Sequence, residues 1–252
     1  MAQGLAWEAR RRGVRCTVVV PDHAPAAKLA AIQRLGATFV KVPFEAWWQI
    51  LVDRTHPGME GLFIHPTADA HVVAGDGTIG LEIFEDLPDA GAVLVPWGGG
   101  GLSCGIASAL HAAGSPAKVY ACEVETAAPF SASLAAGRPT TTPYTPSFID
   151  GIGGRSVFPE LWNLATRELA GSLVVSVAEA AAAVRYLVSR ARIVAEGAGA
   201  VPVAAALALE RGAQGAPRTP GGKAPAGKVV CVVSGGNIDA AVLARILGGA
   251  PG

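Results

Sequence analysis

The fold is decided by the stretch Val93-Leu94-Val95-Pro96-Trp97-Gly98-Gly99-Gly100-Gly101-Leu102-Ser103. Its apolar run ends at Pro96, four glycines follow, and a helix-forming segment continues from Leu102 to Ala113. This order predicts a strand, a glycine loop and a helix. Glycines let the backbone turn several N–H groups toward one point, and the positive end of the helix dipole lies beside them. The stretch therefore predicts a binding site for a phosphate group.

Two other interpretations of the loop stay open. Four glycines could form a structural turn, although each costs roughly 0.5–1 kcal/mol relative to alanine. A dinucleotide-binding fingerprint can also be placed on Gly98 and Gly100, with Glu123 as the acidic residue that holds a ribose. That alternative would make the protein a nicotinamide-dependent oxidoreductase. A P-loop does not fit, because no lysine follows Gly101.

The composition indicates a compact protein with a large core. The chain has 252 residues, of which 51% are hydrophobic and 16% charged, and its formal net charge is +0. Such a balance gives no global attraction to nucleic acid or to an acidic membrane. The beginning of the chain does not have the pattern of a signal peptide, and the four cysteines show no CxxC spacing. We expect a cytoplasmic protein with neither nucleic acid nor membrane as a partner.

The first third of the chain predicts a βαβ unit. Helical patterns cover residues 2–12 and 25–35, and apolar strands cover residues 16–20 and 38–42. Further along, Gly75-Asp76-Gly77-Thr78 is expected to introduce a helix over residues 79–87.

The second half contains longer loops and three more helices. Residues 137–160 are expected to form a long surface loop, and Ser176 and Glu179 have capping-box spacing before a helix at 180–191. The remaining elements are a strand at 118–122, a turn at 196–200 into a helix at 201–210, a loop at 212–227, and a strand at 228–233. That last strand runs into Ser234-Gly235-Gly236-Asn237, which is expected to open a helix at 238–247. Ligands bind at such strand ends in α/β sheets.

The glycine loop and the Ser234-Gly235-Gly236-Asn237 stretch together resemble the fold-type II pyridoxal-phosphate enzymes. The most similar branch is that of the threonine/serine dehydratases, which includes serine racemase. Weaker motifs match in the same order along essentially the whole chain: Ala2-Gln3-Gly4-Leu5-Ala6, Pro25-x-x-Lys28, Ile32-x-x-Leu35-Gly36-Ala37, His65-Pro66, Gly75-x-Gly77-Thr78-Ile79, Asp150-Gly151-Ile152 and Glu196-x-Ala198-Gly199-Ala200. At Gly197 the family usually has proline.

The resemblance implies a fold, a cofactor and a reaction. The fold is a two-lobed α/β structure of the tryptophan synthase beta type, with parallel sheets flanked by helices, a small lobe at residues 1–66 and a larger one at 67–252. The cofactor is pyridoxal 5′-phosphate, and the implied ligands of its phosphate are Gly98, Gly99, Gly100 and Gly101, with Leu102 beginning the helix. Ser234 meets the pyridine nitrogen. The reaction is β-elimination of water from threonine or serine to give a keto acid and ammonia, in a homo-oligomer (dimer or tetramer) when full length.

The main departure from the family concerns the lysine that forms the Schiff base. In the family this lysine and a Ser-x-Gly-Asn loop precede the segment that matches Ala2-Gln3-Gly4. None of the five lysines stands in the family's lysine context; they are Lys28, Lys41, Lys118, Lys223 and Lys228. We therefore assign no catalytic residue and expect an N-terminally truncated, inert chain. A pseudoenzyme that binds the cofactor without turnover is the alternative.

A divalent-cation site is not expected. Some family members bind a cation near the loop, and Glu123 matches its acidic ligand. The second acidic ligand would lie a few residues further on, where this chain has Ala127, Ala128 and Pro129.

Overall fold

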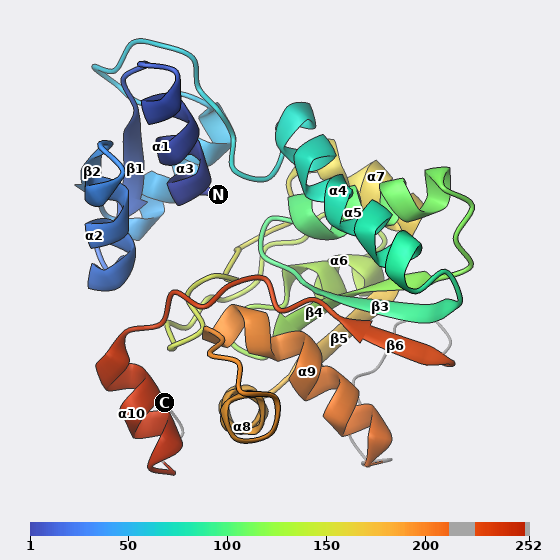
Figure 1. Cartoon of the computed structure of the whole chain (residues 1–252). Helices are drawn as coiled ribbons and strands as arrows, with labels where there is room; N and C mark the ends of the chain where they lie inside the picture. The colour runs from blue at the N-terminus through green and yellow to red at the C-terminus, as the bar shows by residue number, and fades with distance from the viewer. Residues whose placement is uncertain (212–224, 250–252) are drawn as a thin grey trace. The chain divides into compact units, whose positions relative to one another are not determined.

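The computed structural model describes residues 1–211 and 225–249 (Figure 1). The chain divides into two compact units, one formed by Met1–Pro66 with Asn237–Asp239 and the other by Thr67–Gly236 with Ala240–Gly252. Both units contain parallel strands and flanking helices. The predicted α/β class is confirmed. The loop expected at 212–227 and the lysine at position 223 lie largely or wholly outside the described residues.

The smaller unit is built on the predicted βαβ unit. Its elements are α1 (Ala2–Arg11), β1 (Thr17–Pro21), α2 (Ala26–Arg34), β2 (Thr38–Val42) and α3 (Phe44–Asp53). Strands β1 and β2 are parallel, with Thr17 opposite Thr38 and Pro21 opposite Val42. Ala6, Ile32 and Ala37 form a small buried cluster that joins α1 and α2 to this pair of strands.

The larger unit is a parallel sheet covered on both faces. Its strands are β3 (Ala90–Pro96), β4 (Lys118–Val124), β5 (Leu169–Val175) and β6 (Lys228–Cys231), in the order β5-β4-β3-β6. Its helices are α4 (Ala70–Asp86), α5 (Gly101–Ala112), α6 (Pro129–Ala136), α7 (Pro159–Glu168), α8 (Val177–Tyr186), the π-helix η1 (Leu187–Ala191), α9 (Gly197–Glu210) and α10 (Ala240–Leu247).

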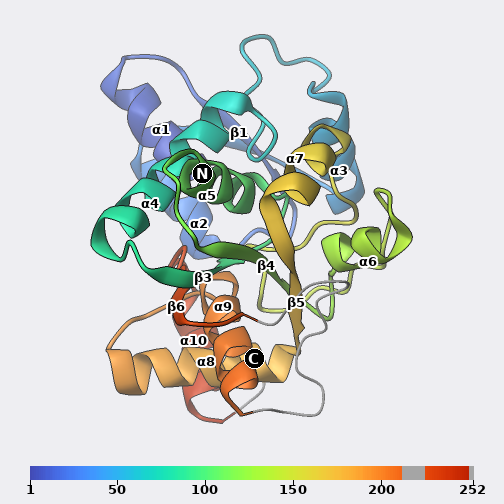
Figure 2. The same ribbon diagram turned by 90° about the vertical axis from the view of Figure 1, so that its right-hand side faces the viewer.

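Figures 1 and 2 show α4 and α5 on one face of this sheet and α8 and α9 on the other. Strand β3 lies inside the sheet, and its residues from Ala92 to Val95 have 0% exposure. A parallel strand that is buried on both faces has an almost continuous apolar sequence. This explains the apolar run that precedes the glycine loop.

Several glycines that were expected to lie in turns before helices lie inside the helices instead. Helix α4 begins at Ala70 rather than near residue 79, because the Asp69 side chain caps it by accepting from the His71 N–H at 2.9 Å. Its glycines allow close packing on α5: a Cβ on Gly80 would lie 2.6 Å from the carbonyl oxygen of Ile106. Likewise α9 begins at Gly197, so the turn expected at 196–200 is wrong.

Other boundaries also differ from expectation. Strand β4 continues to Val124, and β6 ends at Cys231. Residues 232–239 have no regular secondary structure, so the Ser234 stretch does not open α10. The capping box at Ser176 and Glu179 is confirmed, although α8 ends at Tyr186 and continues as the π-helix. Helices α6 and α7 and strand β5 were not anticipated.

Candidate functional site

The glycine loop joins the carboxyl end of β3 to α5. Gly100 has a φ of +94° and occupies the N-cap position of this 12-residue helix. Within the described part of the chain, the N–H groups of Gly98, Gly99, Gly100 and Gly101 donate to no protein acceptor. The Ser103 hydroxyl, which donates to the Pro96 carbonyl oxygen at 3.3 Å, ties the first turn of the helix to the end of the strand. Unpaired N–H groups at a helix N-terminus are suited to an anion.

The loop has no room for side chains at three of its four positions. A Cβ on Gly99 would overlap the side chain of Thr67, and one on Gly101 would overlap the Thr67 carbonyl oxygen. A Cβ on Gly100 would lie 2.5 Å from the indole ring of Trp97. The glycines are therefore required by the packing around the loop, and the loop presents backbone rather than side chains.

Ser234 follows the carboxyl end of β6, beside the glycine loop. Strand β6 is the neighbour of β3, with Cys231 opposite Leu94, and the Val232 N–H donates to the Leu94 carbonyl oxygen at 3.0 Å. Because the strands are parallel, their carboxyl ends meet at one edge of the sheet. Ser234 is exposed, and its hydroxyl has no hydrogen-bond partner among the described residues. The structure thus brings together the two site segments that the sequence indicated.

A third segment lies between them. A Cβ on Gly98 would come 3.4 Å from the Gly151 carbonyl oxygen, and one on Gly151 would come 3.3 Å from Oε1 of Glu196. The same Glu196 oxygen lies 2.7 Å from the position of a Cβ on Gly235, and the Glu196 N–H donates to the Gly235 carbonyl oxygen at 3.0 Å. The sequence contained Asp150-Gly151 and Glu196 only as matches to the family, and it gave no signal for the packing of Thr67.

Glu123 is an internal cap and not a ligand-binding group. Its carboxylate is fully buried and accepts from the N–H groups of Phe130 and Ser131, both at 2.8 Å, and from the Ser172 hydroxyl at 2.6 Å. Burial raises the pKa of Glu123 to about 7, against the lowering effect of these three donors. Donors surround both oxygens, which removes the basis for a ribose-binding role. No cluster of three or more His, Cys, Asp or Glu side chains suited to a metal ion occurs among the described residues.

The described lysines of the larger unit lie at the opposite edge of the sheet. Lys118 begins β4 and Lys228 begins β6, where it pairs with Asp89 at 2.7 Å. The glycine loop and Ser234 follow the carboxyl ends of strands, so these two amines are separated from them by the length of the sheet. Lys28 and Lys41 belong to the smaller unit.

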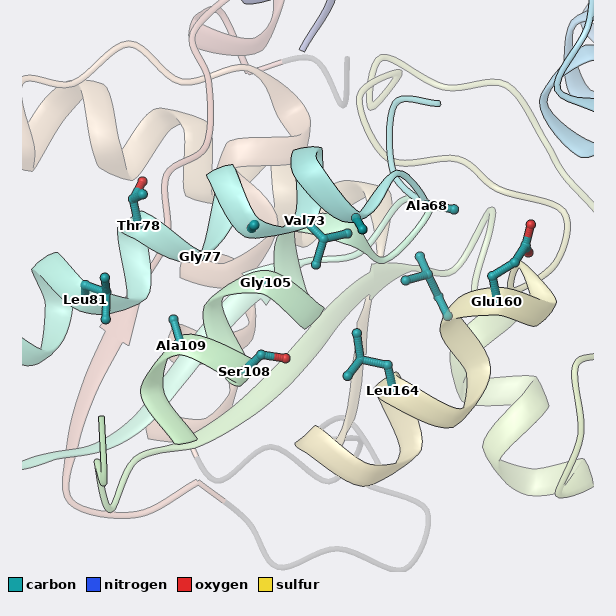
Figure 3. Close-up of a pocket in the computed structure, with 13 residues that line it drawn as sticks. Ala68, Val73, Gly77, Thr78, Leu81, Gly105, Ser108, Ala109, Glu160 and Leu164 are labelled. Atoms are coloured by element: carbon teal, nitrogen blue, oxygen red, sulfur yellow. The ribbon is translucent and has the colours of Figure 1, made fainter. Parts of the chain in front are cut away.

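A hollow of about 530 Å³ opens elsewhere on the larger unit, between α4, α5 and α7 (Figure 3). Its walls are mostly alkyl groups, such as those of Val73, Leu81 and Leu164, and its polar side chains are Thr78, Ser108 and Glu160. None of the predicted site residues lines it. Because no cationic side chain lines this hollow, the glycine loop remains the candidate for phosphate.

Among the described residues, none of the helices combines the length and the apolar character needed to cross a membrane.

Comparison with known proteins gives a consistent result. The sequence pattern of the family "Pyridoxal-phosphate dependent enzyme" matches residues 1–235. The chain is 37% identical to L-threonine ammonia-lyase of Thermotoga maritima over 249 residues, which is 98% of this chain and 59% of that protein. It is 35% identical to L-threonine dehydratase catabolic TdcB of Escherichia coli over 251 residues, 98% of this chain and 73% of that protein. The chain therefore spans little more than half the length of some of its relatives.

Solved structures agree with the sequence matches. The processed form of threonine deaminase isoform 2 from Solanum lycopersicum superposes with a TM-score of 0.81 at 28% identity, covering 98% of this chain and 71% of that one. Maize serine racemase superposes with a TM-score of 0.80 at 27% identity, covering 97% of this chain and 72% of that one.

Proposed function

The chain belongs to the family of pyridoxal-phosphate-dependent enzymes, and on that premise we propose that it serves β-elimination of water from a hydroxy amino acid. Threonine and serine are the proposed substrates, and a keto acid and ammonia are the products. Pyridoxal phosphate is the cofactor of this family. The resemblance indicated by the motifs is thereby confirmed at the level of the family.

One observation carries the assignment of the cofactor site. Two ligand-like segments, far apart in the sequence, follow adjacent parallel strands at one edge of the sheet. The first offers four N–H groups without acceptors among the described residues, and the second offers an exposed hydroxyl. A ligand with an anionic end and a polar ring fits both. The residues present therefore suit pyridoxal phosphate.

The protein's own groups would have distinct tasks. Gly98, Gly99, Gly100 and Gly101 would bind the phosphate through their N–H groups, at the positive end of α5, where Leu102 begins the first turn. The Ser234 hydroxyl would donate to the pyridine nitrogen without forcing that nitrogen to be protonated. When bound, the cofactor supplies an electron-withdrawing ring that makes the Cα proton of an amino acid more acidic. A neutral ring partner moderates that effect, which suits elimination.

We also propose that this chain does not turn substrate over by itself. Lys118 and Lys228 lie at the far edge of the sheet, where neither can hold or move a proton at the glycine-loop edge. The homo-oligomeric state and the cytoplasmic location remain proposals as well. The second is supported by the four cysteines, which are all free thiols.

The first test compares ligands that differ only in phosphate. We expect the purified chain to bind pyridoxal phosphate and, more weakly, inorganic phosphate, and to bind pyridoxal least. Titration by absorbance and calorimetry measures these affinities. Equal affinity for pyridoxal and its phosphate would contradict the role of the glycine loop.

The second test addresses turnover. The chain is mixed with pyridoxal phosphate, reduced with borohydride and analysed by mass spectrometry, while threonine and serine are assayed for keto-acid release. We expect no stoichiometric pyridoxyl-lysine and no keto acid. A single adduct together with keto-acid production would show that this chain has an active lysine, and racemised serine without keto acid would favour a racemase.

A further inference from the structure

Trp97 occupies an unusual place between the buried end of β3 and the glycine loop. Its side chain has 1% exposure, and its backbone N–H donates to the Cys122 carbonyl oxygen at 2.8 Å. Its indole N–H is buried and finds no hydrogen-bond partner among the described residues. Burying an unpaired N–H costs free energy that a phenylalanine would not incur. The indole must therefore contribute something that its size, rather than its polarity, provides.

The outer edge of the indole supports the loop. The three atoms nearest to a Cβ on Gly100 are Cη2, Cζ2 and Cζ3 of Trp97, at 2.5, 2.8 and 3.0 Å. These carbons belong to the six-membered ring of the indole. The ring of a phenylalanine would not extend so far from the backbone. The indole is fixed by stacking on Phe130, with centroids 4.2 Å apart and planes 19° apart. Phe130 in turn packs against Trp162 in a T-shaped arrangement, with ring centroids 6.4 Å apart.

The loop is enclosed by these contacts rather than by its own hydrogen bonds. Thr67 packs against Gly99 and Gly101, while the indole edge lies against Gly100. Since the loop N–H groups donate to no described residue, packing must hold them in their present directions.

We propose that Trp97 is a positioning residue, whose indole edge fixes the N–H groups of Gly98 to Gly101 in the arrangement that binds phosphate. This inference rests on the proposed function, because that function identifies phosphate as the ligand. It assigns to this side chain no direct contact with the cofactor. It predicts that shortening the ring loosens the loop more than it weakens the fold.

The test compares Trp97→Phe with Trp162→Phe. The control makes the same chemical change in the same aromatic cluster, one ring further from the loop. We expect Trp97→Phe to weaken binding of inorganic phosphate and of pyridoxal phosphate by about tenfold, because misplaced donors lose affinity steeply. Trp162→Phe should keep the wild-type affinity. Melting temperatures of both variants report any general loss of stability, and equal losses of affinity in the two would overturn the proposal.

A double-mutant cycle tests the contact itself. Gly100→Ala places a methyl group against the indole edge, so it should reduce phosphate affinity strongly in the wild-type background. In the Trp97→Phe background the methyl group has space, and the same substitution should cost several-fold less. Equal effects of Gly100→Ala in both backgrounds would show that the indole does not set the shape of the loop.

Amide hydrogen exchange separates this inference from the proposed function. In ligand-free protein, Trp97→Phe should accelerate exchange of the Cys104 amide, which donates to the Gly100 carbonyl oxygen at 2.9 Å, by about tenfold, and Trp162→Phe should leave it unchanged. If the wild type binds neither phosphate nor pyridoxal phosphate, the proposed function is wrong, yet exchange still decides whether Trp97 holds the loop. Unchanged exchange in Trp97→Phe overturns the positioning role.

Discussion

The two turns that follow the adjacent strands β3 and β6 differ in how far their residues are exposed. The glycine loop after β3 is enclosed by Thr67 and by Trp97, and Gly100 and Gly101 are buried. The turn after β6 leaves Ser234 and Gly236 exposed. In the proposed function both turns bind one ligand, and the difference in exposure matches what each would recognise. A charged phosphate rewards several donors held rigidly, whereas a ring nitrogen needs one hydroxyl that can rotate.

This contrast has a consequence for substitutions. Changes in the enclosed loop should affect both binding and stability, because the glycines that carry the proposed ligand donors are also packed against Thr67 and Trp97. Changes of the exposed Ser234 side chain should affect binding alone. Four experiments, from the largest expected effect to the smallest, examine this difference.

Gly99→Asp should abolish cofactor binding. It places a carboxylate beside the proposed phosphate position and forces its side chain against Thr67. Like charges at close range cost several kcal/mol, so affinity for pyridoxal phosphate should fall roughly a hundredfold or more. Absorbance titration measures it. The matched control is Gly75→Asp on α4, where a side chain meets no atom within 4 Å. Wild-type affinity in Gly99→Asp would refute the phosphate site.

The surroundings of the glycine loop should also make the free energy of unfolding depend on pH, whereas the exposed turn after β6 should not. Glu123 caps α6 by accepting from the N–H group of Phe130, whose ring stacks on Trp97, and its folded-state pKa of about 7 lies above the ordinary 4.5. Its stabilising effect is therefore fully present below the unfolded pKa and is lost as pH rises through about 7. At about 1.4 kcal/mol per pKa unit, the total change is about 3 kcal/mol at most.

Urea unfolding of wild type and Glu123→Gln between pH 4 and 8 measures this dependence. As pH rises, the free energy of unfolding of the wild type should fall relative to that of Glu123→Gln, because only the wild type titrates at this position. A constant difference over that range would show that Glu123 keeps one protonation state.

Gly105→Ala should destabilise the packing of α5, the helix that follows the glycine loop, against α4. A Cβ on Gly105 would overlap the Val73 carbonyl oxygen and lie 3.0 Å from the Gly77 nitrogen, and backbone atoms cannot move aside cheaply. Overpacking of this kind costs about 1–3 kcal/mol. In contrast, Gly75→Ala adds its methyl group to open space and should stabilise α4 by about 0.5–1 kcal/mol. Urea denaturation distinguishes these two opposite signs.

Ser234→Ala should give the smallest effect, confined to binding. Loss of one hydrogen bond to the ring is worth about 1 kcal/mol, or roughly fivefold in affinity. The melting temperature should not change, since Ser234 is exposed and makes no hydrogen bond with the described residues. Ser234→Thr keeps the hydroxyl and should restore the affinity. A lower melting temperature in Ser234→Ala would contradict the expectation that this side chain affects binding and not stability.

The sequence predicted the segments of the site better than their surroundings. The predicted order of strand, loop and helix is confirmed, and α5 begins one residue before the expected start. Glycines caused the main errors: Gly77 and Gly199 allow close packing inside helices, and their partners Gly105 and Gly235 lie tens of residues away. A local pattern cannot distinguish a glycine that breaks a helix from one that fits against another backbone.

The walls of the loop were beyond sequence reasoning for the same reason. Thr67 precedes the loop by about thirty residues, and nothing in its neighbourhood suggests a contact with Gly99. Strand β5 was missed because Gly171 and Ser172 interrupt a short apolar run, although Ser172 is placed there to meet Glu123. Contacts of this type appear only when the sheet has assembled.

The left-handed backbone at Gly100 has a consequence for chirality. Its φ of +94° is the mirror image of a conformation that L-residues adopt readily, and an L side chain there would point at the indole. A D-alanine at this position, introduced by chemical ligation, would have the matching backbone preference, and its methyl group would not occupy the Cβ position that lies against Trp97. The genetic code offers only one residue without handedness. At Gly100, natural variation therefore has no neighbouring solution, and a mirror-image residue is the nearest chemical substitute.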